Sequence, residues 1–247
     1  MATSPLEQFQ IKEIIPIHVG NLDFSFTQSS LVMLIAVLAT SLLMTLGVKG
    51  RQLIPGRLQN VPEMLYEFVA GVVNDNLHEE GKKYFPFVFS LFMLVLMGNL
   101  LGLIPGSFTY TSHIIVTGAL ALFVFFMTTI IGIARHGLHF FSIFLPPGLP
   151  LIMAFLIVPI EIISYLSRPL SLSVRLFANM TAGHTMLAVF GGFSVSLMTV
   201  TMGAVLGILP IAVNVALLGL ETMIAFIQAY VFAILTCIYI KSVIELH

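Results

Sequence analysis

A long apolar stretch with arginines inside it constrains this chain most. The sequence is almost wholly hydrophobic from Leu149 to Ile240 and contains only four charged residues there, Glu161, Arg168, Arg175 and Glu221. Arginine does not lose its proton in a protein, and placing it at the centre of a bilayer costs about 2.5–3.5 kcal/mol on insertion scales. Such a residue usually faces a water-filled path, a counter-charge or a partner, so Arg175 is the first functional candidate.

The composition indicates a polytopic membrane protein. Hydrophobic residues make up 58% of the 247 residues and charged residues only 9%, whereas a soluble domain has about 25% charged residues. The net charge of −1 gives no basic field for nucleic acid. The single cysteine, Cys237, excludes an intrachain disulfide, and we expect it to pack as a small apolar residue. The scattered histidines show no metal-ligand spacing, so we expect neither a metal nor a cofactor.

The first part of the chain predicts ordinary spans and one surface helix. Residues 1–30 lack the pattern of a cleavable signal, and we expect them to form an N-terminal segment on the outer side. Residues 31–48 are the first predicted span, and residues 85–104 and 113–134 are the next two. Residues 60–82 combine apolar residues at helical spacing with five carboxylates, which predicts an amphipathic helix.

Two longer apolar segments follow, residues 151–190 and 195–240. At about 1.5 Å per residue each would reach roughly 60 Å, twice the thickness of the hydrocarbon core. These segments must therefore tilt steeply, bend or break. We expect the turn between them at Gly191-Gly192, and bends at Gly203, Gly207 and Pro210. The whole is then an all-α protein with about five transmembrane helices, in which residues 84–247 form the main membrane domain.

Basic residues predict the orientation of the chain. They flank the ends of the predicted spans, at Lys49, Arg51, Arg57, Lys82, Lys83, Arg135 and Lys241. Five spans place all of them on one side, which the positive-inside rule assigns to the cytoplasm or the mitochondrial matrix. The N-terminus is then outside and the C-terminus inside. The inverted pseudo-symmetry of many transporters is not visible.

Two polar stripes run through the long apolar segments. In the first, Glu161, Ser164, Arg168, Ser171 or Leu172, Arg175 and Asn179 are spaced by three or four residues, which places them on one helix face. In the second, Asn214, Glu221 and Gln228 recur every seven residues, which is also one face. His184 lies nine residues beyond Arg175, toward the outer end.

These residue types favour proton handling. Carboxylic acids and histidine can bind and release protons when their environment suits. An arginine that stays charged forms a permanent barrier between an outer path and an inner path, and it attracts a carboxylate that has lost its proton. The mobile proton-binding carboxylate must come from a partner.

Each candidate also has a structural interpretation. Glu161 and Arg168 could form a polar network near the inner interface, and Arg168 could extend its side chain to that interface. Glu221 or Gln228 could hydrogen-bond a neighbouring helix. His184 could be a satisfied interfacial histidine. These alternatives stay open on the sequence alone.

Several motifs resemble subunit a of rotary (F-type) ATP synthases. The most specific is the run from Pro169 to His184, PLSLSVRLFANMTAGH. Further matches are Leu220-Glu221 with residues 227–232, the run from Asn99 to Pro105, and Glu161 to Ser164. Together they cover the chain from about residue 60 to its end. The start, SPLEQF at residues 4–9, resembles mitochondrial and alphaproteobacterial members.

The resemblance implies a stator subunit that is not catalytic alone. Its two long helices would lie against a ring of c subunits, with b-type peripheral-stalk subunits as further partners. Two offset half-channels would carry protons to and from a ring carboxylate. Arg175 would separate them, with Asn179 and Gln228 as polar neighbours. The remaining implied path residues are His184 and Glu221 toward the outside, and Glu161 and Ser164 toward the inside. Arg168 and Asn214 are added to the predicted path from the polar stripes.

Two other classes of function stay as alternatives. A stand-alone secondary transporter would use Arg175 to bind an anionic substrate in a cavity of the single chain. An intramembrane hydrolase would pair His184 with a serine such as Ser194 and would need an oxyanion hole. The sequence shows no glycine-rich phosphate loop, so it does not indicate a nucleotide site.

Overall fold

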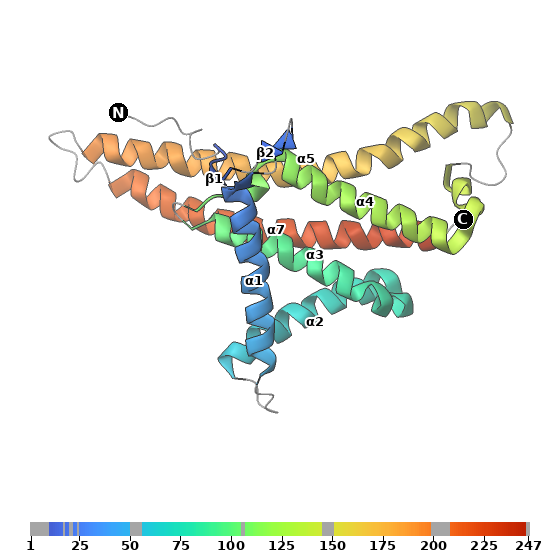
Figure 1. Ribbon diagram of the computed structural model, residues 1–247, viewed down its shortest axis with the longest axis horizontal. Helices are drawn as coiled ribbons and strands as arrows, with labels where there is room; N and C mark the ends of the chain where they lie inside the picture. Colours follow the sequence, from blue (N-terminus) through green and yellow to red (C-terminus); the bar gives the residue numbers. More distant parts are fainter. Residues whose placement is uncertain are drawn as a thin grey trace. The chain divides into compact units, whose positions relative to one another are not determined.

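The chain folds almost entirely into helices. The computed structural model describes residues 10–16, 18–19, 22–23, 25–49, 56–104, 107–144, 151–198 and 208–245. Its long elements are α1 (Gln28–Val48), α2 (Arg57–Leu77), α3 (Gly81–Gly102), α4 (Ile114–His136), α5 (Leu151–Met198) and α7 (Ile208–Ile244) (Figure 1). Five apolar helical segments of this described part are long enough to cross a membrane. Because hydrocarbon offers no hydrogen-bond partner, a helix that satisfies its own backbone is the form such a sequence adopts. The prediction of an all-α polytopic membrane protein is confirmed.

Paired strands precede the first helix. β1 (Glu13–Ile15) pairs with β4 (Phe26–Thr27), and β2 (His18–Val19) pairs with β3 (Leu22–Asp23), both antiparallel. The sequence did not predict them, because strands of two or three residues have too few alternating positions to give a periodic signal.

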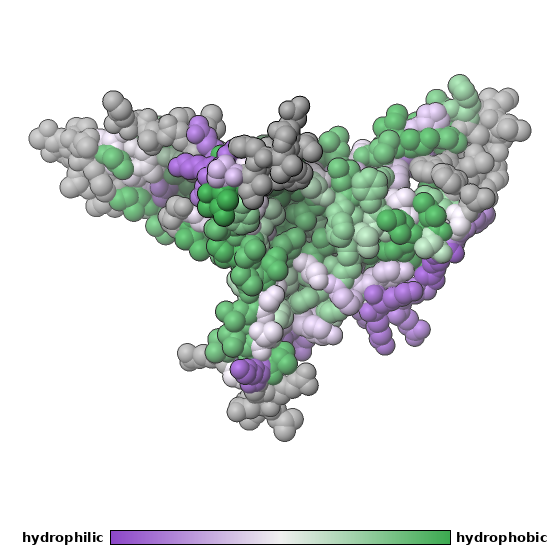
Figure 2. Space-filling view, viewed as in Figure 1, coloured by the Kyte–Doolittle hydropathy of each residue, from purple (hydrophilic) through white to green (hydrophobic). Residues whose placement is uncertain are grey.

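α2 and α3 form a helical hairpin through the short 3₁₀ turn η2 (His78–Glu80). The buried side of α2 carries Val69, Val73 and Leu77, which recur every four residues. The ring of Tyr66 lies 4.7 Å from that of Phe85 on α3, so the two helices pack side by side. Figure 2 shows apolar side chains over the helices and hydrophilic side chains gathered at this turn.

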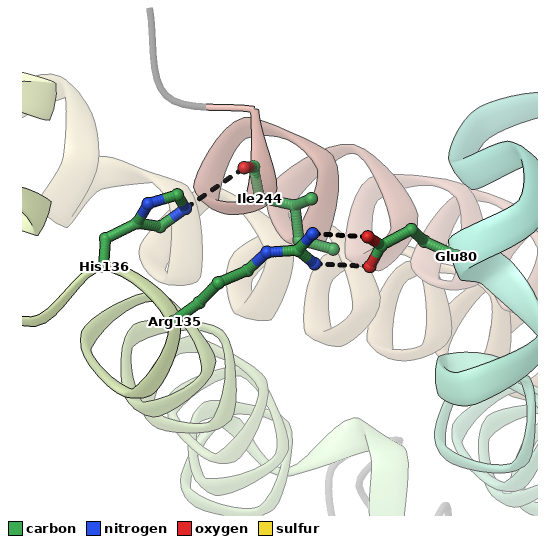
Figure 3. A network of polar contacts seen from close by, with 4 residues as sticks. All are labelled: Glu80, Arg135, His136 and Ile244. Carbon is green, nitrogen blue, oxygen red and sulfur yellow. Dashed lines mark hydrogen bonds and ion pairs between the residues drawn. The ribbon is translucent and has the colours of Figure 1, made fainter.

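Polar contacts hold the end of α4 (Figure 3). Both terminal nitrogens of Arg135 donate to the two carboxylate oxygens of Glu80 in η2. The Nε2 atom of His136 lies 3.1 Å from the carbonyl oxygen of Ile244 on α7. Because Arg135 and Glu80 are both exposed, solvent screens their charges and this ion pair adds little to stability.

Each of the two long helices, α5 and α7, is unbroken over its own length. They have 48 and 37 residues, or about 72 and 55 Å at 1.5 Å per residue. The predicted turn at Gly191-Gly192 is wrong, because both glycines lie inside α5 and neither has a positive φ. A helix tolerates an interior glycine at a cost of about 1 kcal/mol, and the apolar context favours keeping the backbone bonds.

Of the other predicted bends, only that at Pro210 falls in the described residues, and there the prediction is wrong. Gly203 and Gly207 lie outside the described residues. Pro210 lies in the first turn of α7, where a missing N–H costs no helix hydrogen bond, so it does not bend the helix. Pro159 and Pro169 are instead the prolines inside α5, and the first half of that helix is curved in Figure 1.

Contacts divide the chain into two compact units. The first consists of Met1–Leu46, Met93–His113 and Leu176–Ala229. Its core includes the fully buried Tyr110, whose hydroxyl donates to the Leu94 carbonyl oxygen at 2.8 Å. The second consists of Gly47–Phe92, Ile114–Arg175 and Tyr230–His247. Its core includes a cluster of Phe140, Tyr165 and Val243.

Candidate functional site

The polar stripe of α7 lies on the buried side of that helix. Glu221 and Gln228 are 7% and 2% exposed, and Asn214 is half-buried. The opposite side carries exposed apolar residues such as Met223. The seven-residue spacing therefore predicted correctly that the three polar residues share a face. The tertiary packing buries this face.

Two residues of α5 meet this stripe within the first unit. The Nδ2 atom of Asn179 donates to Oε1 of Gln228 at 2.9 Å. The carboxyl group of Glu221 packs on Gly183, so closely that a Cβ there would overlap Oε1. The other oxygen of Glu221, Oε2, is buried and has no hydrogen-bond partner among the described residues. A buried carboxyl oxygen in this state is suited to carrying a proton rather than a charge.

His184 lies beside a cavity in the same unit. Its Nε2 atom is 3.0 Å from Oγ1 of Thr109, in the segment between α3 and α4. The cavity has a volume of about 470 Å³, and its polar lining side chains are those of His184, Asn214, Ser107 and Ser194. Five predicted path residues, Asn179, His184, Asn214, Glu221 and Gln228, therefore belong to one compact unit.

The predicted residues of the second unit are arranged differently. Arg175 is exposed on α5 and makes no hydrogen bond or ion pair with any described residue. Glu161 is half-buried and Ser164 is exposed. No described contact joins either of them to another predicted site residue. Leu172 is 1% exposed, so Ser171 is the residue that belongs to the exposed face at this turn.

Arg168 is fixed between α5 and α7. Its Nη1 atom donates to Oγ of Ser242 at 3.1 Å. Its guanidinium carbon lies 5.3 Å from the ring centre of Tyr165 and 5.4 Å from that of Tyr239. Each cation–π contact contributes about 0.5–2 kcal/mol. The side chain therefore packs against neighbouring aromatic rings, unlike that of Arg175.

Sequence reasoning missed three residues of this site. Thr109 contacts His184 across 75 positions of the chain, so no periodicity could have found it. Gly183 directly precedes His184 in a motif noted for its resemblance, but its packing against Glu221 depends on the tertiary fold. Gly102 is the glycine of the Asn99–Pro105 run and makes room for Thr109.

Fold and site together define a multi-pass membrane protein with a titratable, polar interior between its two longest helices. The protein-family model described as ATP synthase A chain matches residues 30–241. ATP synthase subunit a of Rhodospirillum rubrum is 54% identical over 244 residues and covers 99% of each chain. Subunit a of Pelagibacter ubique is 53% identical over 248 residues and covers 100% of each. That of Paramagnetospirillum magneticum is 52% identical over 247 residues and covers 99% of each.

The chain therefore belongs to the ATP synthase subunit a family. The resemblance to the mitochondrial and alphaproteobacterial type of subunit a, inferred from the motifs, is confirmed by relatives that include alphaproteobacterial proteins.

Proposed function

We propose that this chain is the proton-conducting stator subunit of an ATP synthase membrane sector. Two offset half-channels carry protons to and from the carboxylates of a ring of c subunits, and Arg175 separates the two channels. Membership of the subunit a family supports the membrane-sector role. The observation that carries the detailed mechanism is the position of Arg175, exposed on an apolar helix without a hydrogen bond or ion pair to any described residue.

Arg175 needs an anionic partner from outside the chain. An unpaired guanidinium in hydrocarbon is unfavourable by several kcal/mol, and the charge cannot be removed by deprotonation. A deprotonated carboxylate on a passing c subunit satisfies it and leaves again once protonated. Because the arginine carries no transferable proton, it also blocks direct passage from one half-channel to the other.

The outer path uses the residues of the first unit. Protons enter through the cavity beside Asn214 and His184. Glu221, packed on the residue directly before His184, receives the proton next. The hydrogen-bonded pair of Asn179 and Gln228 borders the inner end of this path. The inner path is proposed to follow Glu161 and Ser164, with Arg168 fixed at its edge by Ser242 and the two tyrosine rings.

The orientation of the chain in the membrane, its segments and its partners are part of the same proposal. The N-terminus faces the outer side and the C-terminus the cytoplasm, because the basic residues flanking the spans then lie inside. Residues 1–30 form the outer segment, 31–48 the first span and 84–247 the proton-translocating domain. The amphipathic region predicted at 60–82 consists of most of α2, the turn η2 and the first residues of α3. The c-ring, b-type peripheral-stalk subunits and lipid are the partners.

The site gives the two alternatives little support. The hydroxyl of Ser194 donates to the Phe190 carbonyl oxygen of its own helix at 3.0 Å, as a structural serine does. A stand-alone transporter would need Arg175 to line a substrate cavity of the chain, and the residues that line the 470 Å³ cavity belong to the first unit, which does not contain Arg175.

Replacing Arg175 tests the barrier role. In membrane vesicles that contain the whole complex, Arg175→Ala should abolish ATP synthesis driven by a proton gradient and increase passive proton leak through the membrane sector. Arg168→Ala is the matched control, because this arginine has partners within the chain and should not open a leak. Retained synthesis in Arg175→Ala would refute the barrier role.

Crosslinking tests which side of α5 faces the ring. Ser171→Cys introduces a near-isosteric thiol on the exposed side, four residues before Arg175. Leu176→Cys places the same thiol at a fully buried position and serves as the control. With a second cysteine beside the ring carboxylate, only Ser171→Cys should crosslink and stop ATP-driven proton pumping. Absence of a crosslink in the intact complex would favour a function without a ring.

A further inference from the structure

A groove lies between α2 and α3, close to the turn η2 that joins them. Its volume is about 460 Å³. Tyr66, Ala70 and Asn74 line it from α2 at intervals of four residues, so one face of this helix forms a wall of the groove. Lys82 and Phe85 line it from α3. All of these residues belong to the second compact unit, so the hairpin itself builds the groove.

The end of the groove farther from the turn is apolar. The rings of Tyr66 and Phe85 lie 4.7 Å apart there. Ala70 and Gly71 continue the wall of α2 toward the turn with no polar side chain. A Cβ at Gly71 would meet nothing within 4 Å, so there is open space beside this residue. This end of the groove can therefore take an apolar chain.

The end of the groove next to the turn is polar. The side chains of Asn74, His78 and Lys82 line it, and none of them makes a hydrogen bond or ion pair with a described residue. His78 is also the one described non-glycine residue with a positive φ, 50°, a strained conformation of the kind that binding sites retain. Unpaired donors from two elements of the hairpin therefore gather at one place.

The charge at this end is positive. Among the described residues that line the groove, Lys82 is the one lysine, arginine or carboxylate residue. The neighbouring carboxylates of Asp75 and Glu79 do not line it. The carboxylate of Glu80 accepts hydrogen bonds from both terminal nitrogens of Arg135. The polar end therefore favours an anion.

The groove also lies where a membrane changes from headgroups to hydrocarbon. α3 is an apolar helix of 22 residues within a segment long enough to cross a membrane, and its lysines are at its start. Lysines at the end of a span lie at the level of the headgroups. On α2, Leu58 and Met64 are 75% and 60% exposed, as in a helix that lies in this interface. A molecule in the groove would meet both regions.

We propose that the groove between α2 and α3 binds one anionic phospholipid, with its phosphate at Asn74, His78 and Lys82 and an acyl chain between Tyr66 and Phe85. The lysine and the uncharged donors bind the phosphate oxygens. The acyl chain removes the apolar end of the groove from water. A free phosphate would leave that end empty. This inference goes beyond the proposed proton path and does not depend on it.

Photolabelling of the whole complex tests this site. The complex is reconstituted in phosphatidylcholine vesicles with a trace of phosphatidylglycerol that carries a diazirine in one acyl chain, and the labelled peptides are identified by mass spectrometry. We expect label between residues 66 and 85. Lys82→Ala should lower it about fivefold, the contribution of one lysine to binding an anionic lipid. Gly71→Leu should remove it, because the leucine side chain fills the open space.

Lys83→Ala is the matched control. It removes the same charge one position further along α3, and Lys83 does not line the groove. Its labelling should stay near that of the wild type. ATP hydrolysis and the subunit content of the complex report that each variant assembles.

Several results would overturn the proposal. Equal losses in Lys82→Ala and Lys83→Ala would show general attraction of anionic lipid to the surface. Equal labelling by a phosphatidylcholine probe with the same diazirine would remove the role of the anionic headgroup. Displacement of the probe by excess inorganic phosphate would assign the groove to free phosphate. An unlabelled wild type, with loss of a stalk subunit in Gly71→Leu, would show that a protein segment occupies the groove.

Discussion

Replacing Gly183 by alanine should change the rate of ATP synthesis much more than the stability of the protein. A methyl group at this position would overlap Oε1 of Glu221, and it would lie 2.8 Å from Cδ and 3.0 Å from Cγ of the same side chain. Overpacking typically costs about 1–3 kcal/mol, while glycine to alanine inside a helix gains about 1 kcal/mol. The net loss of stability in Gly183→Ala is therefore about 0–2 kcal/mol.

The functional effect should be larger than this stability change. The overlapping atoms are the flexible end of Glu221, so the carboxyl group can move while the backbones of α5 and α7 stay in place. A displacement of about 1 Å at a reacting group can lower a rate by as much as 10²-fold. We expect Gly183→Ala to assemble normally and to slow proton-driven ATP synthesis roughly 10- to 100-fold.

Gly192→Ala is the matched control for this experiment. It is the same substitution in the same helix, and a Cβ there meets nothing within 4 Å. Both variants are compared in vesicles for ATP synthesis under a fixed proton gradient, and in detergent for thermal unfolding. Equal synthesis rates in the two variants would refute the argument that the position of the Glu221 carboxyl controls proton delivery.

Three further predictions follow from other contacts. Asn179→Leu should destabilise the complex by about 1–3 kcal/mol in thermal unfolding, because it leaves the buried amide of Gln228 unpaired, and adding Gln228→Leu should recover part of this loss. Gly132→Leu should prevent normal assembly, judged by the yield of complex, because a Cβ there already lies 2.6 Å from the Phe140 ring; Gly118→Ala on the same helix has 3.6 Å of room and should be tolerated. Burial lowers the pKa of His113 from its ordinary value of 6.5. The unfolded chain then binds a proton at a higher pH than the folded chain, so the free energy of unfolding should fall as the pH drops below 6.5. The part of this pH dependence that His113 causes should be absent in His113→Gln.

The sequence predicted well what depends on local pattern. Apolar length indicated the membrane spans, because a helix is the form that satisfies its own backbone in hydrocarbon. The seven-residue spacing of Asn214, Glu221 and Gln228 placed them on one face, since helix periodicity fixes relative direction within an element. The prediction of a turn at Gly191-Gly192 was wrong, because the conformational freedom of glycine permits a turn without requiring one.

What the sequence by itself determined is the class of protein and the set of polar residues on each long helix. Only the tertiary structure decided that Glu221 rests on Gly183, that Asn179 bonds Gln228, and that Thr109 contacts His184. The physical reason is that helix periodicity acts over a few residues. These contacts join distant segments, and their distances depend on how whole helices pack.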